Sequence, residues 1–129
     1  MQIKDAYTGQ GKKRMLFFRE SALKPKQLLE GITLRAVSGD KTMMTFFEFE
    51  PHALIPPHRH VHEQITYVVE GEIEFTVDGE TKLLSAGEGV IILSNQEHSA
   101  RILDKPAKAL DAWYPIREDC RCTQKESGD

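Results

Sequence analysis

Three histidines and a glutamine have the residue types and the spacing of a metal site. His58, His60 and Gln64 lie at even intervals in one segment, so in an extended strand their side chains point to the same side. His98 lies far downstream, after another apolar segment. Imidazole nitrogens and an amide oxygen suit a divalent metal ion. If two strands bring these four side chains together, they hold one divalent ion, for which Zn, Ni, Mn and Fe are all open.

The charge of this ligand set predicts the kind of substrate. Three neutral imidazoles and one amide leave the full 2+ charge of the ion uncompensated. Such a centre acts as a strong Lewis acid and attracts a small anionic substrate. The alternative is that Gln64 only packs beside the site.

A second group of chemically competent residues lies near the end of the chain. Asp111 and Trp113 alternate onto one face of the last predicted strand, and Arg117 follows. A carboxylate that points into an apolar interior is costly unless it is paired or functional. The planar fork of Arg117 could bind a substrate carboxylate, or it could pair with Asp111, Glu118 or Asp119. Spacing alone favours a surface ion pair.

The segments that carry these residues read as short strands separated by turns. Asp78-Gly79 is the strongest hairpin signal. Turns at intervals of roughly 8–12 residues, with little helix, indicate an all-β sandwich or barrel. The predicted strands are 32–37, 43–50, 65–69, 73–77, 83–84, 90–93, 100–103 and 107–114.

The first part of the chain has a weaker pattern. Residues 15–18 could form a short strand, and residues 21–30 are at most a helical turn that is broken near Pro25 and ended by Gly31. We therefore expect residues 1–31 to be an extension that packs on or pairs with a barrel formed by residues 32–120. Residues 121–129 form a polar tail that we expect to be mobile.

Composition sets the broad class. A chain of 129 residues with 40% hydrophobic residues, 29% charged residues and a net charge of −3 gives no electrostatic case for nucleic-acid binding. It has no apolar run of the roughly 20 residues that a transmembrane helix needs, and no apolar signal-peptide core, so we expect a cytoplasmic protein without a membrane partner. Cys120 and Cys122 are too close for a structural disulfide; they are interpreted as part of an exposed tail, with a redox or metal pair as the alternative.

Two segments resemble the motifs of the cupin family. His58-x-His60-x3-Gln64-x6-Gly71 resembles the first motif, in which the Gln64 position is usually Glu, and residues 87–98 resemble the second. The resemblance extends over residues 37–120. It implies a double-stranded β-helix, or jelly roll, and the lack of an internal repeat implies a single barrel.

The chain departs from both motifs. His52 stands where the first motif usually has Gly, and Leu93 and Ser94 stand where the second usually has Pro. These departures affect loop geometry more than metal binding. His62 lies outside the motif's ligand set, and we interpret it as a residue behind the ligands or at the surface. We interpret His52 as a loop residue.

The same histidine segment, taken with Asp111-x-Trp113 and Arg117, resembles the pectin-degradation cupins. These are small metal-dependent bacterial proteins that convert unsaturated uronates to linear ketouronates. The resemblance implies an acid/base role for Asp111, a packing role for Trp113, where the family usually has Phe, and a carboxylate anchor at Arg117. It also implies the four metal ligands that are His58, His60, Gln64 and His98.

Two other functions and one assembly state remain to be weighed. A metal-dependent oxygenase of a small acid is open, because three-histidine iron sites exist among cupins, and so is a non-catalytic cupin that binds a sugar or another small ligand. The segments 15–18 and 43–49 carry more aromatic surface than one small barrel can cover, so we expect a homodimer.

Overall fold

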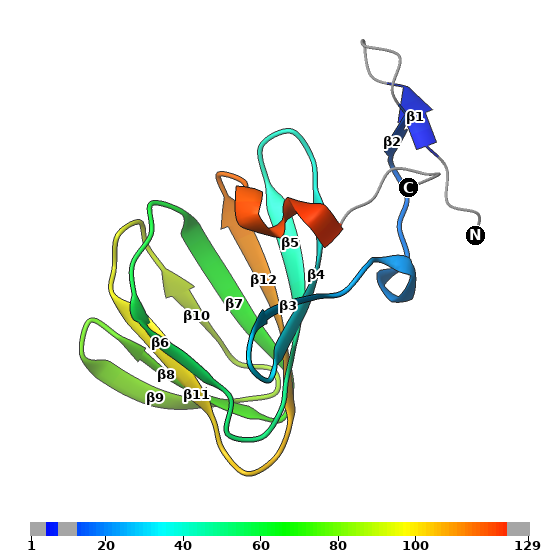
Figure 1. The fold of residues 1–129 in the computed structure, drawn as a ribbon. Coiled ribbons are helices and arrows are strands. Elements are labelled where there is room, and N and C mark those ends of the chain that lie inside the picture. Colours follow the sequence, from blue (N-terminus) through cyan, green and yellow to red (C-terminus); the bar gives the residue numbers. More distant parts are fainter. Residues whose placement is uncertain (1–4, 8–12, 124–129) are drawn as a thin grey trace.

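Two antiparallel β-sheets form the body of the protein (Figure 1). The computed structural model describes residues 5–7 and 13–123. The larger sheet has the strand order β10-β7-β12-β5-β4-β3, and the smaller sheet has the order β6-β11-β8-β9. The strands of the larger sheet are β3 (Lys26–Leu29), β4 (Ile32–Ser38), β5 (Met43–Phe49), β7 (Glu63–Glu70), β10 (Gly89–Ile92) and β12 (Ala107–Tyr114). Those of the smaller sheet are β6 (Leu54–His58), β8 (Glu72–Val77), β9 (Glu80–Ser85) and β11 (His98–Ile102).

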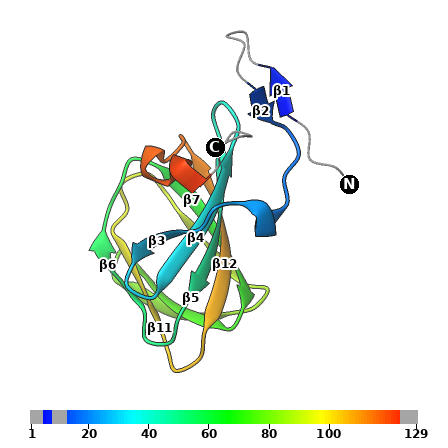
Figure 2. The ribbon, with the colours of Figure 1, turned by 45° about the vertical axis from the view of Figure 1, so that its right-hand side comes forward.

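The remaining elements lie near the two ends of the chain. Strands β1 (Asp5–Tyr7) and β2 (Lys13–Met15) pair with each other, apart from both sheets (Figures 1 and 2). The 3-10 helix η1 (Glu20–Ala22) precedes β3, and η2 (Glu118–Thr123) packs against β3 and β4. In the part of the chain that the structure describes, neither helix is long and apolar enough to cross a membrane.

The core follows from strand alternation. In β5 and β12 every second residue is buried, and Phe47, Phe49 and Ala109 point inward toward the smaller sheet. Ile73 in β8 and Leu34 in β4 are fully buried. Each such side chain contributes about 1.5–3 kcal/mol by leaving water. The predicted all-β class is confirmed.

The turn between β7 and β8 needs glycine. Gly71 has a φ of +81°, a conformation that side chains rarely adopt. A Cβ at this position would also lie 2.5 Å from the carbonyl oxygen of Pro106. The glycine that ends the first motif therefore allows β7 to turn tightly beside the start of β12.

Strand register brings the candidate residues to one end of the barrel. His98 at the start of β11 lies opposite His58 at the end of β6. In the larger sheet, Trp113 of β12 lies opposite Gln64 of β7, and Asp111 lies opposite Thr66. Two candidate residues of the smaller sheet and three of the larger sheet thus reach the same end from strands that are far apart in the sequence.

The prediction for residues 21–30 was wrong over its second half. Residues Lys26–Leu29 form a strand that pairs with β4, and only Glu20–Ala22 is helical. Pro25 removes a helical hydrogen-bond donor, and Gly31, with a φ of +75°, reverses the chain into β4. The position of the predicted domain boundary at residue 31 stays a prediction, and residues 124–129 of the predicted tail lie outside the described residues.

Two other strand predictions differ in detail. Of the predicted strand 15–18 only Met15 lies in a strand, while Phe18 packs its ring 6.1 Å from that of Phe46. Residues Leu54–His58 lie in none of the predicted strands, yet they form β6, which includes the two prolines before His58. The prolines are tolerated because β6 is an edge strand, where one side of the backbone makes no ladder hydrogen bonds.

Candidate metal centre

The structure brings three of the four predicted ligands into one cluster. The ligand atoms of His58, His60 and His98 all lie within 4.8 Å of one another. The His98 ring centre is 4.2 Å from that of His58 and 4.7 Å from that of His60. His60 lies beyond the end of β6, so the loop, rather than the strand alternation that we expected, directs its ring toward His58.

Backbone carbonyls fix the orientation of all three rings. Nδ1 of His58 donates to the carbonyl oxygen of Pro56 at 2.9 Å, and Nδ1 of His98 donates to that of Gln96 at 2.9 Å. Nδ1 of His60 donates to the carbonyl of the residue two positions on, at 3.0 Å. A carbonyl only accepts, so each ring carries its proton on Nδ1. Each Nε2 therefore keeps a lone pair for a metal, an arrangement common among metal-binding histidines.

Gln64 is oriented in the same way by its own hydrogen bonds. Its Nε2 donates to Oγ1 of Thr66 at 2.9 Å and to Oδ2 of Asp111 at 3.2 Å. Its Oε1 is buried and has no hydrogen-bond partner among the described residues, and the same is true of His60 Nε2. Unpartnered buried acceptors are costly, and a cation satisfies both. Three imidazole nitrogens and one amide oxygen thus fit a divalent transition metal.

Burial keeps His60 and His98 in the state that a metal requires. Desolvation lowers the pKa of His98 to about 4, against the raising effect of its hydrogen bond to the Gln96 carbonyl. Desolvation also lowers the pKa of His60. Both rings are therefore neutral at pH 7 in the metal-free protein, and a metal displaces no proton from their Nε2 atoms.

Burial shifts the pKa of Asp111 in the opposite direction, upward. Asp111 is 4% exposed, and burial raises its pKa to about 7, against the lowering effects of the Thr66 hydrogen bond and the Arg117 charge. One oxygen, Oδ2, accepts from Gln64, while Oδ1 is buried without a partner among the described residues. A carboxyl group with this pKa exchanges a proton readily near neutral pH.

Trp113 and Arg117 form one packed unit beside the cluster. The Trp113 indole donates from Nε1 to Oγ1 of Thr45 at 2.8 Å, which fixes the plane of the ring. The guanidinium carbon of Arg117 lies 4.7 Å from the centre of that ring, a cation–π contact. Arg117 also pairs with Asp119, one of the three carboxylates that the sequence left open as its partner. The Arg117 side chain is 17% exposed and that of Asp119 is 54% exposed, so the pair lies at the edge of the site, with its carboxylate open to water.

These residues line one cavity of about 210 Å³, which is small beside the roughly 300–1,000 Å³ of pockets for drug-sized ligands. Its wall includes His58, Gln64, His98, Asp111, Trp113 and Arg117. Apolar side chains from β3, β5 and β8 complete the wall.

Some contributors to the site were not expected from the sequence. Thr66 follows Gln64 by two residues in the same strand, so alternation could have placed it on the same face. Thr45 gave no such signal, because its role depends on the pairing of β5 with β12. His62 supports His60 through its carbonyl and packs its own ring edge-on against Trp113 at 6.4 Å.

His52 lies away from the cluster, in the turn after β5. It has a φ of +66°, the region that favours glycine, and it is exposed. This explains why the first motif usually has Gly at that position. The turn is held by the His52 backbone N–H, which donates to the carbonyl of Leu103 at 2.9 Å.

Comparisons with known proteins agree on one family. The Cupin domain model matches residues 45–113. The pectin degradation protein KdgF of Dickeya dadantii (strain 3937) is 30% identical over 96 residues, which cover 73% of this chain and 87% of that protein.

Solved structures give the same result. The structure of KdgF from Halomonas sp. matches with a TM-score of 0.75 and 30% identity, over 80% of this chain and 96% of that chain. An RmlC-like cupin from Shewanella frigidimarina NCIMB 400 matches with a TM-score of 0.76 and 28% identity, over 81% and 94%. The two sheets are thus the predicted jelly roll, and the chain belongs to the cupin family.

Proposed function

We propose that this cupin is a metal-dependent enzyme that opens the ring of a 4,5-unsaturated uronate and yields a linear ketouronate. The observation that carries the proposal is the buried Oδ1 of Asp111, which has no hydrogen-bond partner among the described residues. Asp111 lines the same cavity as Gln64, whose Oε1 is the proposed metal ligand. A proton donor and acceptor beside a cationic centre is what an isomerisation of an anionic sugar needs. The similarity to the pectin degradation protein KdgF supports the substrate class.

The reaction is an isomerisation, so no co-reactant is needed. The hydroxyl on the hemiacetal carbon loses a proton, the bond from that carbon to the ring oxygen breaks, and the former ring oxygen gains a proton, which leaves an aldehyde and an enol. The enol then becomes a ketone when its hydroxyl loses a proton and its carbon gains one. Only protons move in addition to the broken bond, and the atoms of substrate and product are the same.

Each residue of the site has a separate role in this reaction. His58, His60, Gln64 and His98 would hold the ion, which when bound supplies positive charge to a substrate oxygen. Asp111 takes a proton from oxygen and returns one to carbon. Arg117 binds the substrate carboxylate with its planar fork. Trp113 forms the floor beneath that guanidinium and narrows the cavity.

The test is turnover of the 4,5-unsaturated galacturonate monomer, followed by loss of its ultraviolet absorbance, with protein loaded in turn with Zn, Ni, Mn and Fe. We expect activity with at least one metal and none after chelation. Dissolved oxygen is recorded in the same assay. Oxygen consumption would favour the oxygenase, and binding of the sugar without turnover would favour a ligand-binding cupin.

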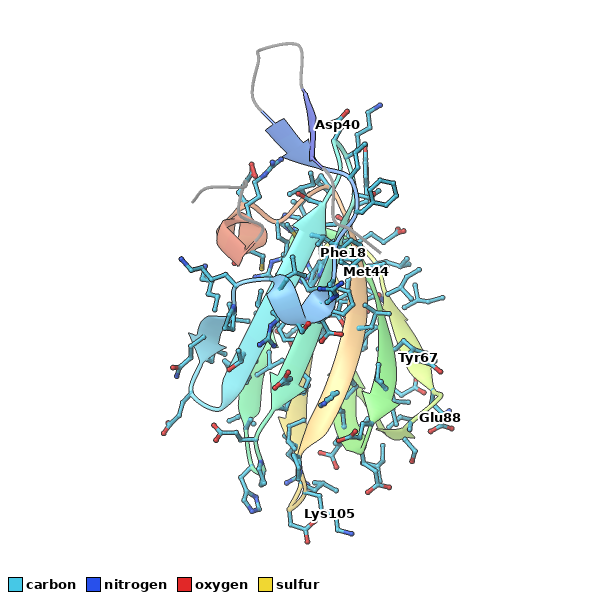
Figure 3. The ribbon with its side chains drawn as sticks, turned by 90° about the vertical axis from the view of Figure 1, so that its right-hand side faces the viewer. Phe18, Asp40, Met44, Tyr67, Glu88 and Lys105 are labelled. Carbon is cyan, nitrogen blue, oxygen red and sulfur yellow. The ribbon has the colours of Figure 1, made fainter. Side chains whose placement is uncertain are left out.

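We further propose that the protein is a homodimer formed through the outer face of the larger sheet (Figure 3). Two cross-strand rows on this face are apolar for most of their length. The first row contains Val37, Met44, Ala112, Ile65 and Ile91, and the second contains Phe46, Leu110 and Tyr67. Ile65 is 50% exposed and Ile91 is 62% exposed.

A groove beside these rows extends the apolar face. Phe18, from the segment before η1, lies beside Met44 along its wall (Figure 3), and Ile65 lines it as well. A contiguous apolar face of this kind marks an interaction site, and a two-fold axis lets the same face cover itself.

Light scattering at micromolar concentration tests the dimer. Wild-type protein should have twice the chain mass of 14.7 kDa, and Ile65→Lys should shift it to the chain mass while metal content is retained. Thr33→Lys is the matched control, because Thr33 lies on the same outer face but in the row of Glu48, Lys108 and Glu70. A wild-type monomer would refute this assembly.

A further inference from the structure

The Arg117 guanidinium is held by two partners that have different roles. Its Nε donates to Oδ1 of Asp119 at 3.2 Å and its Nη2 donates to Oδ2 at 2.7 Å. Its flat face lies over the Trp113 ring, 4.7 Å from the ring centre. Stacking alone allows the guanidinium to rotate in its own plane. A carboxylate that accepts from two of its nitrogens fixes that rotation.

This arrangement leaves one edge of the guanidinium available. Asp119 uses Nε and one hydrogen of Nη2, and the group has five N–H donors. The remaining donors, on Nη1 and the second hydrogen of Nη2, have no hydrogen-bond partner among the described residues. They form the end-on pair that matches a second carboxylate, and Arg117 lines the cavity that also contains His58 and Asp111.

Asp119 is itself fixed by its surroundings. It belongs to η2, which packs against β3 and β4. Nζ of Lys26 in β3 donates to the Asp119 carbonyl oxygen. The next residue, Cys120, is fully buried in the core rather than part of the expected exposed tail, and its N–H donates to the Arg117 carbonyl at 3.0 Å. The strand that the sequence did not predict thus supports the turn that carries Asp119.

We infer that Asp119 is a positioning residue for the proposed reaction: it fixes the Arg117 fork against Trp113 so that its free edge receives the substrate carboxylate. The inference rests on the proposed function for the identity of that carboxylate. Asp119 does not act as a competing ligand, because it occupies the side edge of the fork rather than the end edge. Its side chain is 54% exposed, so water weakens its charge at the cavity, while its two hydrogen bonds still fix the geometry.

Without the Arg117–Asp119 pair, the Arg117 side chain must be ordered when the substrate binds, and this entropy cost should weaken substrate binding. For Asp119→Asn we expect KM to rise about 3- to 10-fold with kcat and metal content unchanged. Asp119→Glu, which can still accept from both nitrogens, should restore part of the loss. Glu118→Gln is the matched control, because Glu118 lies in the same helix but contacts Arg121 at 2.6 Å instead.

Two measurements without substrate separate this inference from the proposed function. Trp113 is the single tryptophan, so the emission of the metal-loaded protein reports on the cation above its ring. The ¹⁵N resonance of Arg117 Nε, assigned by its loss in Arg117→Lys, reports on the pair directly. Both signals should change in Asp119→Asn, change less in Asp119→Glu and stay as in wild type in Glu118→Gln.

The outcomes are decisive in either direction. Unchanged spectra in Asp119→Asn would overturn the positioning role, and a lower KM would make Asp119 a competitor of the substrate. If wild-type protein turns over no unsaturated uronate, the proposed function fails in the kinetic arm. The spectra still decide whether Asp119 positions Arg117.

Discussion

The two halves of the larger sheet differ in where their polar side chains lie. In the half near the metal centre, the inner face carries buried polar side chains, Thr45, Gln64, Thr66 and Asp111. In the other half, the inner face carries Phe47, Phe49, Val68 and Ala109, and the outer face carries a row of Thr33, Glu48, Lys108 and Glu70. Behind the polar inner half, the outer face is the apolar one that we propose to be a dimer interface.

The alternation of side chains is therefore kept along each strand, but in half of the sheet the inner face mixes polar side chains with the apolar Met43, Ile92 and Trp113 while the outer face is apolar. An ordinary antiparallel sheet places apolar residues inside and polar residues outside. Polar side chains on the inside are tolerated because Gln64, Thr66 and Asp111 bond to one another and because the cluster accepts a cation. The comparison teaches that function is concentrated where the usual rule is broken.

The largest expected effect comes from breaking the polar half at its metal cluster. His98→Ala removes one of three converging imidazoles, and we expect dialysed protein to retain no measurable metal, against one ion per chain in wild type. Metal at a hundredfold excess over its dissociation constant should stabilise wild type by about 2.7 kcal/mol and the variant not at all. Elemental analysis and thermal shifts measure both.

His52→Asn is the control for that variant, because Asn tolerates the positive φ of the exposed turn. Metal retained in His98→Ala, at the level of this control, would remove His98 from the ligand set.

The next largest effect is expected from a change at Asp111, which separates catalysis from metal binding in the half of the sheet near the metal centre. Asp111→Asn keeps the size of the side chain but cannot carry the proton, so turnover should fall about a hundredfold or more while metal content stays the same. Glu48→Gln, on the charged outer row, serves as the matched control. A variant with wild-type turnover would exclude Asp111 as the acid/base.

The pH dependence of stability sharpens the comparison further. The folded-state pKa of Asp111 is about 7, because burial disfavours the carboxylate, against roughly 3.9 in an unfolded chain. Its contribution to stability is full below about pH 4 and is lost as the pH rises through 7. The unfolding free energy of Asp111→Asn minus that of wild type, both metal-free, should therefore rise by about 2–4 kcal/mol from pH 4 to 7.

The contribution of His98 to stability changes with pH in the opposite direction to that of Asp111. It cancels when the unfolding free energies of Asp111→Asn and wild type are subtracted. Its folded-state pKa of about 4 lies below its unfolded value, so its contribution is lost as the pH falls from about 6.5 toward 4. Both proteins share this loss. Denaturant titrations across the window measure the difference, and a difference that is flat with pH would mean that Asp111 is ionised in the folded protein.

The sequence predicts the strands and the metal-ligand residues better than it predicts the contacts made by loops and by η2. Alternation indicated the strands and the buried face of β12, and the histidine spacing indicated the cluster. The cluster forms through a loop at His60, however, and no local pattern indicates how a loop directs a side chain. The partner of Arg117 also stayed open among three carboxylates, because η2 is placed by packing against β3 and β4.

The smallest of these effects tests whether Arg117 recognises a carboxylate by geometry or by charge alone. Arg117→Lys keeps the charge but loses the planar fork, the stacking on Trp113 and the two bonds to Asp119. Substrate binding should weaken by about 1.5–3 kcal/mol, seen as a higher KM with metal content unchanged. Arg101→Lys is the matched control, because its exposed pair with Glu74, at 2.6 Å, lies in the smaller sheet outside the cavity. Equal KM values in the two variants would assign Arg117 to the structure of the barrel end and would leave the substrate carboxylate to be bound by another group.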